Sequence, residues 1–165
     1  MDYLWTPWRF AYITQADQAS GCVFCEKLAA ADDERQFIVY RGGKNFVVLN
    51  IYPYTVGHLM VVPYRHIATL EESEPEELAE MMELTRRAEA ALRKIYRPQG
   101  LNVGMNIGKS AGAGVASHLH MHVLPRWQAD ANFMSVIGET RVLPEELPVT
   151  WGKLRREFGA AEERR

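Results

Sequence analysis

The stretch HLHMHVLP, residues 118–125, carries three histidines at every second position and is the segment on which the fold prediction depends. Side chains alternate between the two faces of a β-strand, so His118, His120 and His122 are predicted to share one face, with neighbours about 6.6 Å apart. The residues between them are expected on the opposite, core face: Leu119, Met121 and Val123. Imidazoles this close cannot easily all be protonated, so at least one is expected to stay neutral and nucleophilic near pH 7.

Three explanations fit this histidine row: a solvated strand face that happens to carry histidine, a metal site using all three, or a catalytic site. The preceding stretch NVGMNIGKSAGAGVAS, residues 102–117, favours catalysis. A glycine-rich loop lets backbone N–H groups converge on an anion. Alone, such a loop has a flexible hairpin connection as its alternative explanation. Beside the histidines, it predicts that the loop holds a phosphate while an imidazole attacks it.

The rest of the chain predicts an α+β fold. Four further short segments, rich in Val, Ile and aromatic residues, are predicted strands: 35–41, 45–50, 58–63 and 101–107. A long helix is predicted over 73–96, where apolar residues recur at helical spacing: Leu78, Met81, Met82, Thr85, Ala88, Leu92 and Ile95. Shorter helices are predicted just after Cys25 and in the tail, 150–165. This pattern favours a meandering antiparallel sheet of roughly five strands, with helices on one face.

Composition limits the function classes. The chain has 165 residues, of which 47% are hydrophobic, which is typical of a single domain with a substantial core. Its formal net charge of −2 gives no indication of nucleic-acid binding. The apolar runs are far shorter than the roughly 20 residues that span a bilayer, and the first ten residues lack the pattern of a secretory signal. We therefore expect a cytoplasmic protein without a membrane partner.

The histidine segment resembles the histidine-triad (HIT) family, whose pattern is His-φ-His-φ-His-φ-φ with φ hydrophobic. Upstream, NFVVLNIYPYTVGHLMVVPYRH, residues 45–66, is similar to the strand, turn and strand of that family. The resemblance covers about 22–125, and two flanking stretches, 4–13 and 125–134, resemble the bacterial branch of diadenosine-tetraphosphate phosphorylases and hydrolases. It implies a single HIT domain over 1–165 with N-terminal and C-terminal extensions around that core.

The resemblance also implies an enzyme and assigns roles to its residues. His120 would be the nucleophile, which attacks the α-phosphate of a nucleotide and forms a covalent nucleotidyl-histidine. His122 would bind phosphate oxygens beside it. The other residues implied to contact the substrate are Val48 at the base, Asn50 at the ribose, and Asn106, Gly112, Gly114, Val115 and Ser117 around the phosphates. Without the family, Asn50 is as easily explained as a turn residue after a strand.

Cys22 and Cys25 form a Cys-x-x-Cys pair, and they are the only cysteines in the chain. That spacing alone fits a zinc site, a redox dithiol or two free thiols. The resemblance to the zinc-bearing branch of the family implies that His66 and His118 complete a closed Cys₂His₂ site, which would be structural. His118 would then belong both to the catalytic segment and to the zinc site. His58 receives no role from the resemblance.

The chemistry of the triad leaves the substrate open. The first hypothesis is cleavage of nucleoside polyphosphates such as diadenosine tetraphosphate, by hydrolysis or phosphorolysis. The alternatives are a nucleoside phosphoramidase, another nucleotidyl transferase, or a module that only binds nucleotides. The family resemblance further implies a homodimer or higher homo-oligomer. Three residues beyond the triad fit either a site for the second nucleoside or the leaving phosphates, or packing at a subunit interface or in the C-terminal part: Trp127, Asp130 and Asn132.

Overall fold

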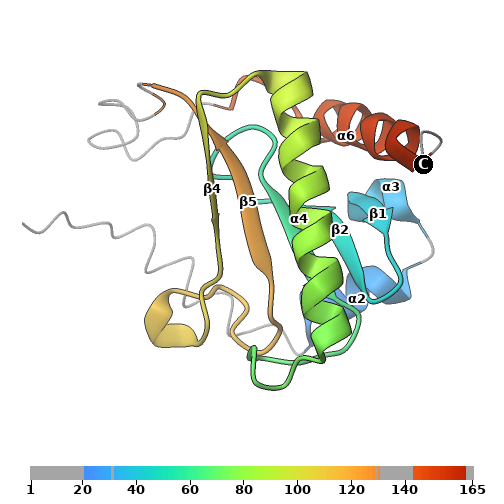
Figure 1. Ribbon diagram of the computed structural model, residues 1–165, viewed down its shortest axis with the longest axis vertical. Helices are drawn as coiled ribbons and strands as arrows, with labels where there is room; N and C mark the ends of the chain where they lie inside the picture. The colour runs from blue at the N-terminus through green and yellow to red at the C-terminus, as the bar shows by residue number, and fades with distance from the viewer. Residues whose placement is uncertain (1–20, 31, 129, 131–142, 163–165) are drawn as a thin grey trace, which may run out of the picture.

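The computed structural model describes residues 21–30, 32–128, 130 and 143–162, and their central element is one antiparallel sheet (Figure 1). Its five strands are β1 (Ile38–Arg41), β2 (Asn45–Leu49), β3 (Leu59–Pro63), β4 (Gly100–Gly104) and β5 (Met121–Arg126). They lie in the order β1-β2-β3-β5-β4, and every neighbouring pair is antiparallel. The predicted α+β fold with a five-stranded antiparallel sheet is therefore confirmed.

Within the described residues, five helical segments accompany the sheet. They are α2 (Val23–Ala29), α3 (Asp33–Gln36), α4 (Pro75–Tyr96), the 3₁₀ helix η1 (Lys109–Ala111) and α6 (Leu147–Glu162). Figure 1 shows α4 lying along the sheet, with α6 beside the C-terminal half of α4. The predicted long helix is thus confirmed, and the predicted tail helix begins earlier than expected and extends over 16 residues.

The ends of α4 follow from local sequence. Pro75 stands in the first turn, where its missing N–H costs nothing, and Glu74 and Glu77 form a reciprocal capping box. At the other end, Arg97 takes a left-handed conformation directly before Pro98, which cannot continue the helix. In the predicted apolar stripe, Met82 is 57% exposed and Leu78 and Ile95 are half-buried, whereas the remaining members are buried: Met81, Thr85, Ala88 and Leu92. The inclusion of Met82 in that stripe was wrong, because Met81 already occupies the core-facing position.

Both faces of the sheet are covered. In β2, Val47 and Leu49 belong to the core cluster under α4 and α6, whereas Phe46 and Val48 belong to a second cluster. That second cluster contains Phe24 of α2. Because alternate residues of a strand point to opposite faces, α2 lies on the face opposite α4. The prediction that helices cover one face was wrong for α2, and the continuous apolar run in β2 is the sequence feature that corresponds to this double coverage.

The histidine segment is only partly a strand. β5 begins at Met121, so His122 lies in the sheet, while His118 and His120 lie in the irregular segment before it. The register with β3 would place Pro63 opposite Leu119, and Pro63 has no N–H to donate to the ladder. The Leu119 N–H instead donates to the Ile67 carbonyl, 2.6 Å away. The predicted strand start was therefore wrong, although the alternation of the side chains holds.

Candidate metal and catalytic site

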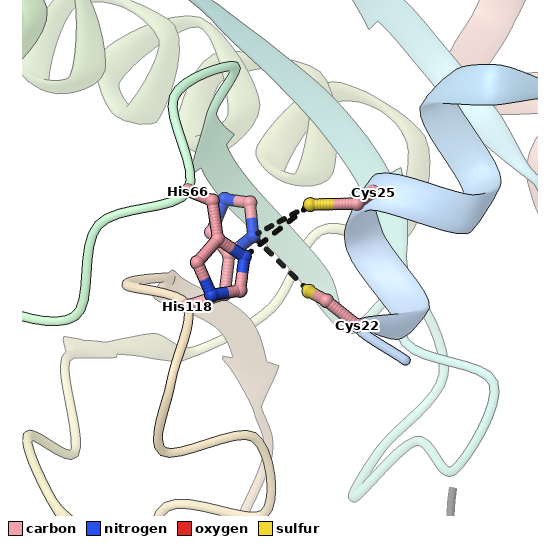
Figure 2. Close-up of side chains that lie close together, drawn as sticks. All are labelled: Cys22, Cys25, His66 and His118. Atoms are coloured by element: carbon pink, nitrogen blue, oxygen red, sulfur yellow. Dashed lines mark hydrogen bonds between the residues drawn. The ribbon is translucent and has the colours of Figure 1, made fainter. Parts of the chain in front are cut away.

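Two cysteines and two histidines from three separate parts of the chain converge on one point (Figure 2). Cys22 and Cys25 lie at the start of α2, His66 follows β3, and His118 precedes β5. The Cys22 Sγ is 3.2 Å from the His118 Nδ1, and the Cys25 Sγ is 3.3 Å from the His66 Nδ1 and 3.7 Å from the His118 Nδ1. All four donor atoms lie within 4.8 Å of one another, as the zinc prediction requires.

The donor geometry fits a zinc ion. Donors bound at about 2.0–2.3 Å in a tetrahedron lie roughly 3.3–3.8 Å apart, which is close to the three distances given above. Two thiolates and two imidazoles are a common ligand set for structural zinc. Burial and the neighbouring Cys22 raise the pKa of the Cys25 thiol, and a bound cation would offset this by stabilising the thiolate. The four residues therefore form a possible closed metal site.

The second ring nitrogen of His118 is also fixed. His118 is fully buried, and its Nε2 lies 2.9 Å from the Pro63 carbonyl oxygen. The Nε2–H therefore donates to this carbonyl, and the Nδ1 lone pair faces the two sulfur atoms. Burial lowers the pKa of His118, which favours the neutral imidazole that a metal requires.

His120 is held differently, through its own Nδ1. This atom lies 2.8 Å from the carbonyl oxygen of His118, so the Nδ1–H donates to that carbonyl. The lone pair of the neutral ring is then on Nε2. Only 4% of the residue is exposed, and burial lowers the pKa of His120, so the ring is neutral near pH 7. A neutral imidazole with a fixed tautomer can act as a nucleophile through Nε2.

His122 pairs with a histidine to which the sequence analysis gave no role. The His122 Nδ1 is 2.9 Å from the Nε2 of His58. The backbone N–H of Tyr54 donates to the Nδ1 of His58 over 3.2 Å, so His58 carries its proton on Nε2 and donates it to His122. By the same reasoning, the proton of neutral His122 is on Nε2. Burial and the neighbouring His120 lower the pKa of His122 to about 4.

A signal for His58 was present in the sequence. His58 immediately precedes β3, and with Met60 it shares the period-two spacing of one strand face. Met60 lies directly opposite His122 in the sheet, so His58 and His122 are on the same face. The strand pairing that brings them together is a long-range property, which is why the motif alone did not reveal the pair.

The predicted substrate-contacting residues lie near this pair or in the glycine-rich loop. Asn50 is 8% exposed, its Oδ1 accepts the Tyr52 N–H, and its Nδ2 is 3.4 Å from the His58 Nδ1. Asn50 is thus both a turn residue and a neighbour of the histidine pair. Val48 is fully buried in the second core cluster, against which Val115 packs.

The glycine-rich loop contains η1 and requires glycine at two positions. Gly108 and Gly112 have φ values of 82° and 89°, which side chains with a Cβ rarely adopt. The Gly112 N–H donates to the Lys109 carbonyl within the loop, 2.9 Å away. Three other predicted contact residues lie along the same connection between β4 and β5: Asn106, Gly114 and Ser117. The loop therefore joins the edge strand β4 to His118.

Asp130 serves the packing of the segment after β5. Its carboxylate accepts two hydrogen bonds from Arg126, at 2.5 and 2.8 Å, and one from the Trp127 N–H, at 3.2 Å. These contacts agree with the packing explanation for Asp130, and Asn132 lies outside the described residues.

Within the described part of the chain, no helix combines the length and apolar character needed to cross a membrane.

Comparison with known proteins identifies clear relatives. The HIT domain model matches residues 32–129. The chain is 44% identical over 151 residues to a Mycobacterium tuberculosis protein named AP-4-A phosphorylase. The aligned region covers 87% of this chain and 77% of that protein. It is 30% identical over 93 residues to an asymmetrical bis(5'-nucleosyl)-tetraphosphatase of Schizosaccharomyces pombe, covering 56% and 50% of the two chains. A Zn-bound histidine triad family protein from Mycobacterium smegmatis superposes with a TM-score of 0.70, at 26% identity, over 88% of this chain and 98% of that one.

Proposed function

This chain belongs to the HIT domain family, and on that premise we propose that it is an enzyme cleaving nucleoside polyphosphates, such as diadenosine tetraphosphate, through a nucleotidyl-histidine. The observation that carries the proposal is the state of His120. Its ring is neutral, its Nδ1–H is bound to a carbonyl, and its Nε2 lone pair is available to attack phosphorus. A module that only binds nucleotides would have no need for such a nucleophile.

In the first step, the Nε2 of His120 forms a bond to the α-phosphorus. The bond from that phosphorus to the bridging oxygen breaks, and the departing polyphosphate keeps the electron pair. His122 supports this step because its Nε2–H points away from His58 and can donate to a phosphate oxygen. Backbone N–H groups of Gly114 and Val115, with the Ser117 hydroxyl, would stabilise the charge on the phosphoryl oxygens. Asn106 and Gly112 complete the proposed phosphate loop.

In the second step, an acceptor oxygen attacks the phosphorus and the P–N bond breaks. The electron pair returns to the Nε2 of His120 and the acceptor oxygen releases its proton to solvent, which regenerates the neutral ring of the free enzyme. With inorganic phosphate as acceptor, diadenosine tetraphosphate yields ADP and ATP. With water as acceptor, it yields AMP and ATP. The 44% identity to AP-4-A phosphorylase favours phosphate, and the more distant asymmetrical tetraphosphatase makes hydrolysis the second candidate.

Nucleoside recognition is proposed at the neighbouring part of the same face. The amide of Asn50 lies beside the His58–His122 pair, so a ribose hydroxyl bound there would be next to the reacting phosphate. Val48 belongs to the apolar cluster on this face and would border the base. Most of the binding area of such a pocket is apolar, and a few polar groups orient the ligand.

The metal site is proposed to be structural. When bound, a zinc ion would cross-link the start of α2 to the His66 loop and to the catalytic segment, and would contribute to folding. Cys22, Cys25, His66 and His118 would hold it, and they leave no open ligand position. His118 would then stay unprotonated and serve catalysis by orienting the neighbouring nucleophile through its carbonyl.

The test is product analysis with diadenosine tetraphosphate, in the presence and absence of inorganic phosphate. Phosphate-dependent formation of ADP and ATP supports phosphorolysis, and AMP with ATP supports hydrolysis. Cleavage of nucleoside phosphoramidates alone would support the phosphoramidase alternative, and no turnover of any of these would contradict the proposal. We also propose a homodimer or higher homo-oligomer and a cytoplasmic location, to be checked by sedimentation and cell fractionation.

A further inference from the structure

We propose that Phe24 is a positioning residue for the nucleophile, and that its ring holds the imidazole of His120 with Nε2 toward the substrate. This inference rests on the proposed role of His120. Phe24 is the third residue of the Cys-Val-Phe-Cys stretch, so it stands between the two cysteines of the metal site. The same short segment therefore supplies two metal donors and one ring that contacts the catalytic segment.

The buried ring of Phe24 contacts two residues of the triad. Only 2% of the residue is exposed. Its ring centroid is 5.2 Å from that of His120, at an interplanar angle of 49°, and 5.4 Å from that of His118, in an edge-on arrangement at 75°. Both separations lie within the range in which aromatic rings attract one another. One phenyl ring thus contacts a proposed metal ligand and the proposed nucleophile at the same time.

His120 needs such a contact because one hydrogen bond does not fix a ring. The bond from Nδ1 to the His118 carbonyl still allows the imidazole to tilt about the donor–acceptor line. On one side, the ring of His122 lies against it edge-on, with 4.8 Å between the centroids. Phe24 supplies a second ring contact, which limits the remaining tilt and therefore the direction of Nε2. A misdirected nucleophile lowers the rate of attack even when the substrate binds normally.

Phe24 is itself well anchored. Its neighbours in sequence include two of the four candidate metal donors, Cys22 and Cys25. Its ring belongs to the buried cluster that contains Val48 and Met60. The metal site therefore reaches His120 by two routes, through the ring of Phe24 and through the carbonyl of His118. The structure assigns the cysteine segment a role in orienting the nucleophile in addition to its role in holding the metal.

The test compares Phe24→Leu with Phe46→Leu in the zinc-loaded full-length protein. Phe46 is a matched control, because it is fully buried in the same cluster and its ring stacks on Tyr64. Zinc content, kcat and KM are measured for each protein. Without substrate, ¹⁵N–¹H spectra of the histidine rings follow the Nδ1 proton of His120, which is visible only while its hydrogen bond protects it from exchange.

We expect Phe24→Leu to keep its zinc, lower kcat about tenfold with little change in KM, and broaden or lose the His120 Nδ1 signal. Phe46→Leu should match the wild type in these three properties. A raised KM with unchanged kcat and an unchanged signal would overturn the proposal and make Phe24 a substrate contact. If Phe24→Leu loses zinc, Phe24→Met replaces it, because the flexible thioether side chain of methionine can fill the irregular space that the ring leaves.

A measurement on the wild-type protein needs no variant. Nuclear Overhauser contacts between the ring protons of Phe24 and His120 should be present in the zinc-loaded protein without substrate, and their absence would overturn the proposal. Failure of the proposed function would look different. The wild type would then cleave no nucleotide, while the ring spectra would still report whether Phe24 holds His120.

Discussion

The two outer histidines of the triad, His118 and His122, are the same residue type four positions apart, yet the fold holds them in opposite ways. The Nδ1 of His118 faces two thiols, and its Nε2 donates to a backbone carbonyl. The Nδ1 of His122 accepts a hydrogen bond from His58, which leaves its Nε2–H for another acceptor. Both nitrogens of one ring face groups of the protein, and the other ring keeps the Nε2–H that we propose as a donor to the substrate.

This difference shows that the role of a histidine in the motif follows from the partners of its two ring nitrogens. Burial lowers the pKa of both residues, so charge alone does not distinguish them. The partners do, because they fix which nitrogen carries the proton. Between them, His120 combines both features: Nδ1 is committed to a carbonyl and Nε2 stays available. Substitution of His120 should therefore have the largest effect on turnover, followed by His122 and then His58.

His120→Ala should give the largest loss. Removing the nucleophile should lower turnover of diadenosine tetraphosphate by at least about a thousandfold, as for other residues that form a covalent intermediate. Zinc content and the circular dichroism spectrum should stay as in the wild type, because His120 is not a proposed metal ligand. A variant that keeps a tenth of the wild-type rate would rule out the covalent mechanism.

His122→Ala should have the next largest effect. It removes one donor to the phosphoryl oxygens but leaves the nucleophile, so kcat should fall about a hundredfold. Steady-state kinetics would measure this loss, and elemental analysis should find the zinc content unchanged. Equal losses in His122→Ala and His120→Ala would contradict the separation of the two roles.

His58→Ala should cost less, about tenfold in kcat, because His58 acts on the substrate only through His122. In the His122→Ala background, the same change should have almost no further effect, and a double-mutant cycle measures this coupling. Thr55→Val is the matched control, because the Thr55 hydroxyl donates to the Pro125 carbonyl from the same turn. Losses that simply multiply would show that His58 and His122 act independently.

The smallest expected effect is on the way the free energy of unfolding changes with pH. The pKa of His122 is about 4 in the folded protein, below its ordinary value of 6.5, so between these values the unfolded chain binds a proton that the folded protein does not. The free energy of unfolding should therefore fall as pH drops from 6.5 toward 4. In His122→Gln, the decline over this window should be shallower, as measured by denaturant titration at fixed zinc. Parallel curves for the two proteins would contradict this pKa.

Elements with strong local signals could be predicted from the sequence. The long helix was predicted correctly because its apolar spacing, its first-turn Pro75 and its terminal Pro98 all act within the segment. The short helix α3 was missed, because its four residues offer too little periodicity. Its Asp32 cap, which accepts the Arg35 N–H, was the available signal.

In the site, too, residues in local motifs could be predicted from the sequence, and residues placed by strand pairing could not. The cysteine pair and the three histidines form recognisable motifs, and the fold brings Cys22 and Cys25 to His66 and His118 as the family resemblance implied. His58 was missed because its role depends on the register between β3 and β5, which no single segment encodes. The β3–β5 ladder ends early because its register places Pro63 opposite Leu119, and this pairing exists only in the folded sheet.

The most direct test of the division between the outer histidines is the zinc content of three purified proteins. Elemental analysis of the wild type and of His122→Ala should each give about one zinc per chain, as a closed four-ligand site requires. His118→Ala should lose most of its zinc, because it removes one of the four ligands. Full zinc in His118→Ala, or loss of zinc in His122→Ala, would contradict the assignment of His118 to the metal and His122 to the substrate.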